Sequence, residues 1–186
     1  MEMLKNIRLS RGRSILRRKV SRIKRTRFRG NIFSAKKIAL VWDADRIDEF
    51  QVLSQFHQKM SDRNIDLHII GYYPGKELPD KLTAVRYLTC LKQQDINFTY
   101  RPVSYETSKF ISASFDILID ANFKNLFPLE YISTLSNAGF KVGIFDNKYE
   151  QPPFDLMIEV RKNSDMNNYL EQVVHYLEMI NKGQTK

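Results

Sequence analysis

The chain has 186 residues, 42% hydrophobic and 12% aromatic, which is enough to build one packed domain with a short appendage and excludes a wholly disordered chain. No apolar run approaches the roughly 18 to 20 residues needed to span a bilayer, and the single cysteine excludes an internal disulfide. The net charge of +9 is uneven, because residues 1–37 carry 14 Lys and Arg with one acid, whereas the remainder is slightly acidic.

This asymmetry predicts three parts: a basic N-terminal arm over residues 1–36, helical or disordered, an α/β domain over 37–182, and a tail over 183–186. The arm contains the stretch RGRSILRRKVSRIKRTRFRG, residues 11–30, with ten basic side chains and no acid. A helix over residues 9–27 would place four apolar residues on one side, namely Leu9, Leu16, Val20 and Ile23.

A basic amphipathic segment of this kind has three physical uses. It can follow the phosphates of a nucleic acid, lie on an anionic membrane surface, or pack on its own domain and present a charged outer face. Arginine dominates the stretch, and the guanidinium fork suits phosphate, which favours RNA or a ribonucleoprotein such as the ribosome. The predicted phosphate contacts are Arg11, Arg13, Arg17, Arg18, Lys19, Arg22, Lys24, Arg25, Arg27 and Arg29.

Beyond the arm, six short apolar runs are predicted to be strands. They cover residues 37–43, 66–73, 96–101, 115–121, 140–145 and 154–160. Several are apolar at consecutive positions, which is typical of parallel strands covered by helices on both faces. Helices are predicted at residues 47–60, at 125–138 and after Asp165, while the stretch around residues 82–95 is compatible with either a helix or a strand. The alternation predicts a single doubly wound, mostly parallel sheet with flanking helices.

The second half of the sequence carries a resemblance to a known group of proteins. The stretch FDILIDANFKNLFPLEYISTLSNAGFKVGIF, followed by PFDLMIEV and NYLEQVVHYLEMIN, resembles a family of small uncharacterised bacterial proteins with DLLIDL, PLxYI, KFKVG and YDLMI blocks in this order. The resemblance covers about residues 37–182. It implies a cytoplasmic bacterial α/β protein, and the family has no assigned activity to transfer.

Polar residues follow several predicted strands, at the ends where α/β sheets bind ligands. The first strand ends in VWDADR, which contains Asp43 and Asp45. FDILIDAN, at the fourth strand, ends in Asp120 and Asn122, and VGIFDN ends in Asp146 and Asn147. If Asp43, Asp45 and Asp120 converge, they could hold Mg²⁺ and act on a phosphorylated or nucleotide substrate, which makes a metal-dependent enzyme the alternative function. Asp and Asn also start turns and cap helices, and no other cofactor is predicted because both Gly-rich phosphate loops are absent.

Two further features have a functional and a structural interpretation. In NFTYRPVSYETSKF, residues 97–110, aromatic and basic residues alternate in a way that could stack bases, but packing of Phe98 and Tyr100 on the core is the favoured interpretation. Cys90 lies in an apolar context and is predicted to be a buried thiol rather than a nucleophile.

Overall fold

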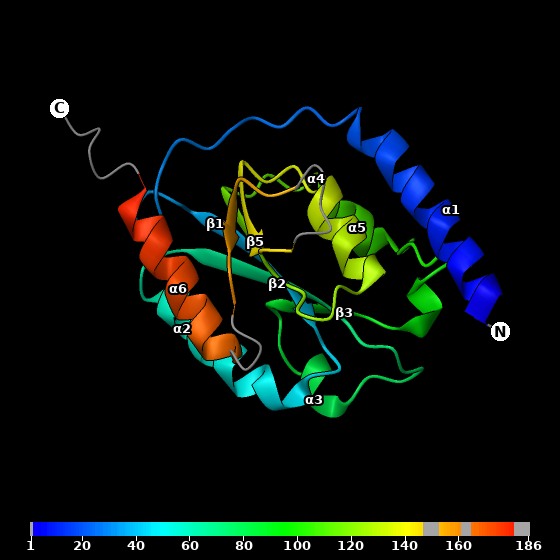
Figure 1. Ribbon diagram of the computed structural model, residues 1–186. Helices are drawn as coiled ribbons and strands as arrows, with labels where there is room; N and C mark the ends of the chain where they lie inside the picture. Colours follow the sequence, from blue (N-terminus) through cyan, green and yellow to red (C-terminus); the bar gives the residue numbers. More distant parts are fainter. Residues whose placement is uncertain (1, 147–152, 161–164, 181–186) are drawn as a thin grey trace.

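The chain folds around one six-stranded, all-parallel β-sheet, shown by a computed structural model that describes residues 2–146, 153–160 and 165–180 (Figure 1). The strands follow the spatial order β3-β2-β1-β4-β5-β6. Their bounds are β1 Lys37–Asp43, β2 Asp66–Tyr72, β3 Leu88–Leu91, β4 Ile117–Ala121, β5 Phe140–Ile144 and β6 Leu156–Ile158. Every pair of neighbouring strands is parallel, which confirms the predicted doubly wound α/β fold.

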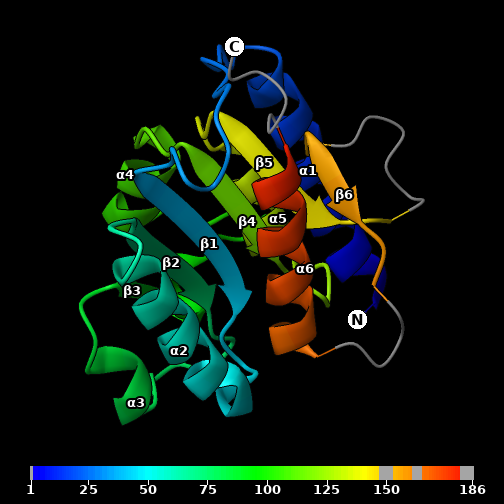
Figure 2. The ribbon, with the colours of Figure 1, turned by 90° about the vertical axis from the view of Figure 1, so that its left-hand side faces the viewer.

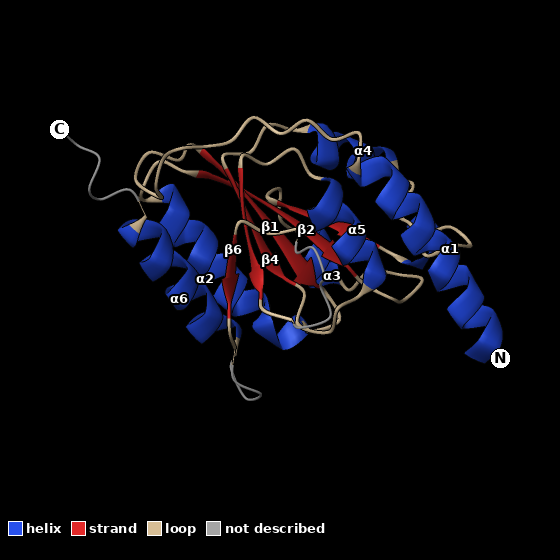
Figure 3. Cartoon of the chain, turned by 45° about the horizontal axis from the view of Figure 1, so that its top comes forward, coloured by secondary structure: helices blue, strands red, loops and turns tan. Residues whose placement is uncertain are grey.

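Helices cover both faces of the sheet (Figure 2). Helices α2, Phe50–Ser61, and α6, Met166–Met179, lie on one face, and α4, Tyr105–Ser112, and α5, Phe127–Leu135, lie on the other. Helix α1, Glu2–Val20, adds an outer layer against α5, as Figure 3 shows. The remaining elements are short, α3 Asp80–Thr83 and two 3₁₀ turns at Ile47–Glu49 and Gln93–Asp95.

The central strand β1 shows how the sequence produces these layers. Its residues alternate between faces, so that Ile38, Leu40 and Trp42 pack towards α2 and α6 while Ala39 and Val41 pack towards α4 and α5. All five are fully buried. A strand buried on both faces therefore appears in the sequence as the continuous apolar run IALVW.

One predicted strand is wrong. Residues 96–101 form a tight turn, closed by a single antiparallel bridge between Ile96 and Pro102, and the third strand is instead β3 within the stretch that the sequence left open. Asn97 is the physical reason, because its side-chain oxygen accepts hydrogen bonds from the backbone N–H groups of Thr99 and Arg101 at 3.0 and 3.1 Å. Such local bonds compete with strand pairing.

The strand order places a topological switch point between β1 and β4. The chain leaves β1 towards β2 and β3, then returns through α4 to place β4 on the other side of β1. The pairing of Val41 with Asp120 and of Trp42 with Ala121 brings the carboxyl ends of both strands together. This is the edge at which open α/β sheets bind ligands, and the arm lies away from it.

Candidate nucleic-acid interface

The basic arm is folded onto the domain. Helix α1 places Leu16 in a buried cluster with Phe127, Tyr131 and Leu135 of α5, and Leu9 packs at its edge. The helix ends at Val20 instead of continuing to residue 27, and Val20 itself is exposed. Packing of only part of the predicted apolar side is sufficient to hold α1, because α5 presents its own aromatic face.

Helix α1 is in close contact with the domain at Gly12. A Cβ atom at this position would lie 2.4 Å from the Thr99 carbonyl oxygen and 2.7 Å from the Phe127 ring. One turn earlier, Arg8 donates from Nε to the Phe98 carbonyl oxygen at 2.6 Å. The 97–100 turn and α5 therefore form the surface on which α1 packs, and a side chain at residue 12 has no room there.

Replacing Gly12 by leucine is expected to detach α1 and to lower the free energy of unfolding by about 1–3 kcal/mol, the usual cost of overfilling a packed contact. Urea unfolding and hydrogen exchange of the α1 amides measure the two effects. Ser14→Leu is the matched control, because Ser14 is exposed on the same helix and its replacement also raises helix propensity, by less than the replacement of glycine does. Equal stability of the two variants would contradict the close contact at Gly12.

After α1, an extended segment crosses the edge of the domain and is fixed by ion pairs. Arg25 donates from Nε to the Ala138 carbonyl oxygen at 2.9 Å and pairs with the Asp155 carboxylate. Arg27 reaches the same carboxylate at 2.6 Å, and Asp155 also accepts the backbone N–H of Lys141 at 2.8 Å. One nearly buried carboxylate thus anchors two cations of the arm to the start of β5 and β6.

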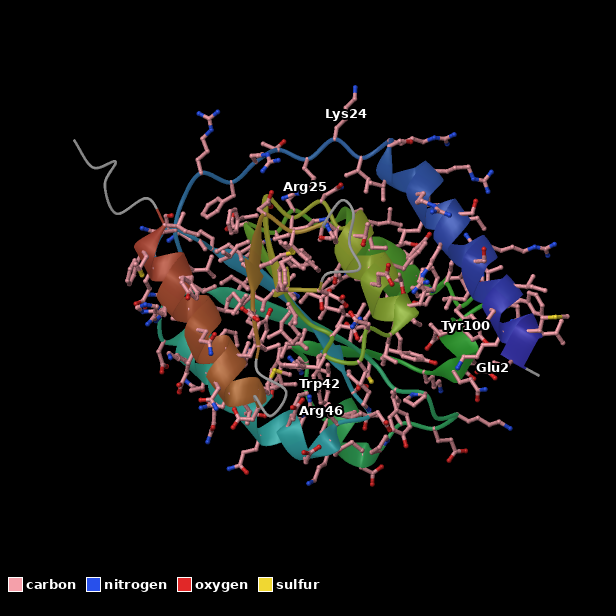
Figure 4. The ribbon with its side chains drawn as sticks, viewed as in Figure 1. Glu2, Lys24, Arg25, Trp42, Arg46 and Tyr100 are labelled. Carbon is pink, nitrogen blue, oxygen red and sulfur yellow. The ribbon has the colours of Figure 1, made fainter. Side chains whose placement is uncertain are left out.

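The arm nevertheless presents most of its charge to solvent. Of the ten cations that the sequence predicts as phosphate contacts, Arg25 alone is half-buried, and Figure 4 shows Lys24 projecting from the segment while Arg25 turns towards the body. The exposed nine are Arg11, Arg13, Arg17, Arg18, Lys19, Arg22, Lys24, Arg27 and Arg29. Within the described ranges, no carboxylate forms a salt bridge with Arg11, Arg13, Arg17 or Arg18.

At the carboxyl end of β1, the first two carboxylates predicted as metal ligands, Asp43 and Asp45, are instead paired with a lysine. Asp43 is fully buried, accepts the backbone N–H of Asp45 at 3.2 Å, and lies 3.0 Å from the Lys124 ammonium group. Lys124 also reaches Asp45 at 3.2 Å, and the hydrogen bond to Asp43 is the main cause that raises the pKa of Lys124. Asp43 and Asp45 therefore share a lysine of the chain itself.

The neighbouring strand ends follow the same turn chemistry. One Asp120 oxygen accepts the backbone N–H of Asn122 at 2.8 Å, and Asn122 in turn donates to the Leu126 carbonyl oxygen at 2.9 Å. Asn125 donates to Asp146 at 3.2 Å, while Asn147 falls outside the described residues. These bonds match the structural interpretation of the sequence, in which Asp and Asn begin the turns after strands.

Charged groups beside this edge are paired as well. Trp42 donates from Nε1 to Glu49 at 3.2 Å, and Arg46 pairs with the other Glu49 oxygen at 2.6 Å. Burial raises the pKa of Glu49 against the opposing effect of Arg46. In Figure 4 the Trp42 and Arg46 side chains lie together at this edge of the sheet.

The Mg²⁺ site of the enzyme alternative stays a prediction. Across residues 2–146, 153–160 and 165–180, no three His, Cys, Asp or Glu side chains gather closely enough to hold a metal ion. Lys124 already forms ion pairs with two of the three candidate ligands, Asp43 and Asp45, so a divalent ion would have to displace its ammonium group. In the same described part of the chain, no helix is long and apolar enough to cross a membrane.

The structure confirms the core interpretation of the aromatic stretch for Tyr100, which is partly buried against the cluster between α1 and α5, and contradicts it for Phe98. It also supports the interpretation of Cys90 as a thiol in an apolar context. Phe98 is 64% exposed at the tip of the 97–100 turn, because this segment is not a strand. Cys90 is half-buried, and burial raises its pKa to about 12, so the thiol carries no charge at neutral pH.

Three residues with central roles were not found from the sequence. Arg8 precedes the densest part of the arm, Lys124 lies 79 positions from Asp45, and Asp155 lies 130 from Arg25. No local pattern connects such distant partners. The sequence shows Asp155 only as a carboxylate at the start of a strand, and its pairing with the arm becomes visible once the structure shows that the arm crosses this strand.

Comparisons with known proteins place the chain in a sequence family. A family model described as "Family of unknown function (DUF6913)" matches residues 10–180. The match begins within α1, so the family pattern includes most of the arm as well as the α/β domain. No curated protein matches the chain.

Proposed function

The chain belongs to DUF6913, a family of unknown function, and we propose that it is a binding module for RNA or a ribonucleoprotein in the bacterial cytoplasm. The binding surface is the outer face of α1 together with the extended segment over residues 21–29. It takes the sugar-phosphate backbone as its ligand. The α/β domain holds this surface in place and adds shape to it.

One observation carries the proposal: the arm is anchored at both ends, yet nine of its ten predicted phosphate contacts remain exposed. A self-packed arm without a partner has no need for cations on the face turned away from its contacts. Fixed exposed arginines also bind phosphate with less loss of chain entropy than a disordered arm would. Release of counterions from the phosphates then supplies the free energy of binding.

The direct test measures binding of the full chain to bulk bacterial RNA and to anionic phosphatidylserine vesicles, each titrated with salt. We expect RNA binding whose logarithm falls linearly with the logarithm of salt, because each neutralised phosphate releases a counterion. Vesicle binding without RNA binding would assign the arm to the membrane surface, where the exposed Met3, Leu4 and Ile7 of α1 could insert.

A second candidate, the metal-dependent enzyme, is favoured by a separate observation. Buried Asp43 and Asp120 lie at the carboxyl ends of neighbouring strands, at the switch point of the sheet. If this edge acts alone on a phosphorylated substrate, the double variant Asp43→Asn, Asp120→Asn loses that activity and keeps its RNA affinity. Loss of RNA affinity in this variant, with full affinity in the arm variant described below, would reverse the ranking of the two functions.

A further inference from the structure

An exposed phenylalanine, Phe98, lies on a hydrogen-bonded turn beside the basic helix. Asn97 closes this turn: its Oδ1 atom accepts from the Thr99 backbone and hydroxyl at 3.0 and 2.9 Å and from the Arg101 backbone at 3.1 Å. Tyr100 adopts a φ of 59°, a left-handed conformation that is rare for an aromatic residue and carries strain. The turn therefore presents Phe98 at its tip, where the ring is mostly exposed and is not part of the core.

Arg8 of α1 completes this arrangement. Its guanidinium carbon lies 4.3 Å from the centroid of the Phe98 ring and 4.4 Å from that of Tyr100, and its Nε donates to the Phe98 carbonyl oxygen. Lys5 and Arg11 are exposed one turn away on each side of Arg8. An aromatic ring and a stacked guanidinium thus lie within a row of cations.

We propose that Phe98 and Arg8 form a stacking site for an unpaired base, so that single-stranded RNA is the substrate class of the arm. This inference rests on the proposed function. A base has an apolar face that stacks on aromatic and guanidinium planes, and its phosphates can follow the cations of α1. Duplex RNA keeps its bases inside the helix and reaches only the cations.

The charge around the ring favours a base over an apolar protein segment. A guanidinium held against the ring makes the surface positive, and Arg101 lies within the same turn, fixed by a 2.8 Å bond from its Nε to Thr99. A base brings its own phosphate to such a surface, whereas an apolar peptide would leave these charges without compensation.

The test compares an unstructured oligouridylate of about 12 nucleotides with a duplex RNA of the same length. Phe98→Ala is expected to weaken binding of the single strand by about tenfold or more and to leave duplex affinity within about twofold. Phe98→Trp, which keeps a stacking plane, is expected to retain the native affinity for both RNAs. Phe98 is exposed, so its replacement leaves the fold intact.

Phe33 supplies a matched control. Its ring is 62% exposed and also faces a guanidinium, that of Arg63 at 5.7 Å, but it lies at the far end of the arm before β1. Phe33→Ala is expected to change neither affinity. If the native chain binds both RNAs and Phe98→Ala changes neither, or weakens both equally, the stacking site is refuted while the proposed function stands. Absence of any RNA binding by the native chain refutes both.

Discussion

A variant with Arg11, Arg13, Arg17 and Arg18 replaced by glutamine is expected to lose about 100- to 1000-fold in RNA affinity at about 0.1 M salt. The reason is the lost counterion release, since a single strand contributes about 0.7 to the slope of log affinity against log salt for each phosphate contacted. Four lost contacts reduce that slope by about 3. Fluorescence anisotropy with labelled RNA across a salt series measures both quantities.

The control for this variant removes the same charge elsewhere. Four exposed cations away from the arm serve for this, on α2, on the loop before α3, in α3 and just after α3, namely Lys59, Lys76, Lys81 and Arg86. Their replacement by glutamine is expected to leave the salt slope close to that of the native chain. Equal losses in the two variants would show that net charge alone governs binding, and that the docked arm has no special part.

The free energy of unfolding is expected to depend on pH because of a buried lysine, Lys141, beneath the arm. Lys141 of β5 is buried and donates to the carbonyl oxygens of Ser133 and Thr134 at 2.8 Å each, at the carboxyl end of α5. Burial is the main cause that lowers its pKa to about 7; repulsion from Arg25 adds to it, and Asp155 and Asp120 oppose it.

The direction of the effect follows from proton linkage. Between pH 7 and about 10.5 the unfolded chain holds a proton on Lys141 that the folded chain has lost, so the free energy of unfolding rises with pH in this window. The full rise is on the order of 5 kcal/mol, and below pH 7 the lysine is charged in both states and the slope vanishes.

Urea unfolding of the native chain and of Lys141→Met, measured from pH 6 to pH 9.5, tests this account of the buried lysine. Methionine keeps the length of the side chain and removes the titrating group. The native chain should therefore gain stability relative to the variant as the pH rises. Loss of the hydrogen bonds to α5 adds only a constant offset. Parallel curves would contradict a lowered pKa for Lys141.

The fold was predictable because burial leaves a local mark on the sequence. β1 was predicted with its observed bounds, Lys37–Asp43, because burial on both faces requires an unbroken apolar run. The stretch at residues 96–101 failed for the opposite reason. There the aromatic and β-branched residues favour a strand, and one hydrogen-bonding side chain, Asn97, decides for a turn.

The cations of the candidate interface are visible in the sequence, whereas their position on the domain is not. Ten cations without an acid indicate a polyanion, and that inference needs no structure. The position of α1 and of the segment after it depends on contacts between residues that are distant in sequence, such as the packing of Gly12 on Thr99 and the ion pair of Arg25 with Asp155. Their spacing follows from the tertiary fold, so no local pattern could reveal that the arm is docked or that Phe98 lies beside it.

The central claim, that RNA binds along the docked arm, is tested most directly by ultraviolet cross-linking of RNA to the full chain, with the cross-linked residues identified by mass spectrometry. Cross-links are expected within residues 8–29 and at Phe98, on the outer face of α1 and on the turn that supports it. Cross-links confined to the ends of β1 and β4, around Asp43 and Asn122, would contradict the claim and return the function to that edge of the sheet.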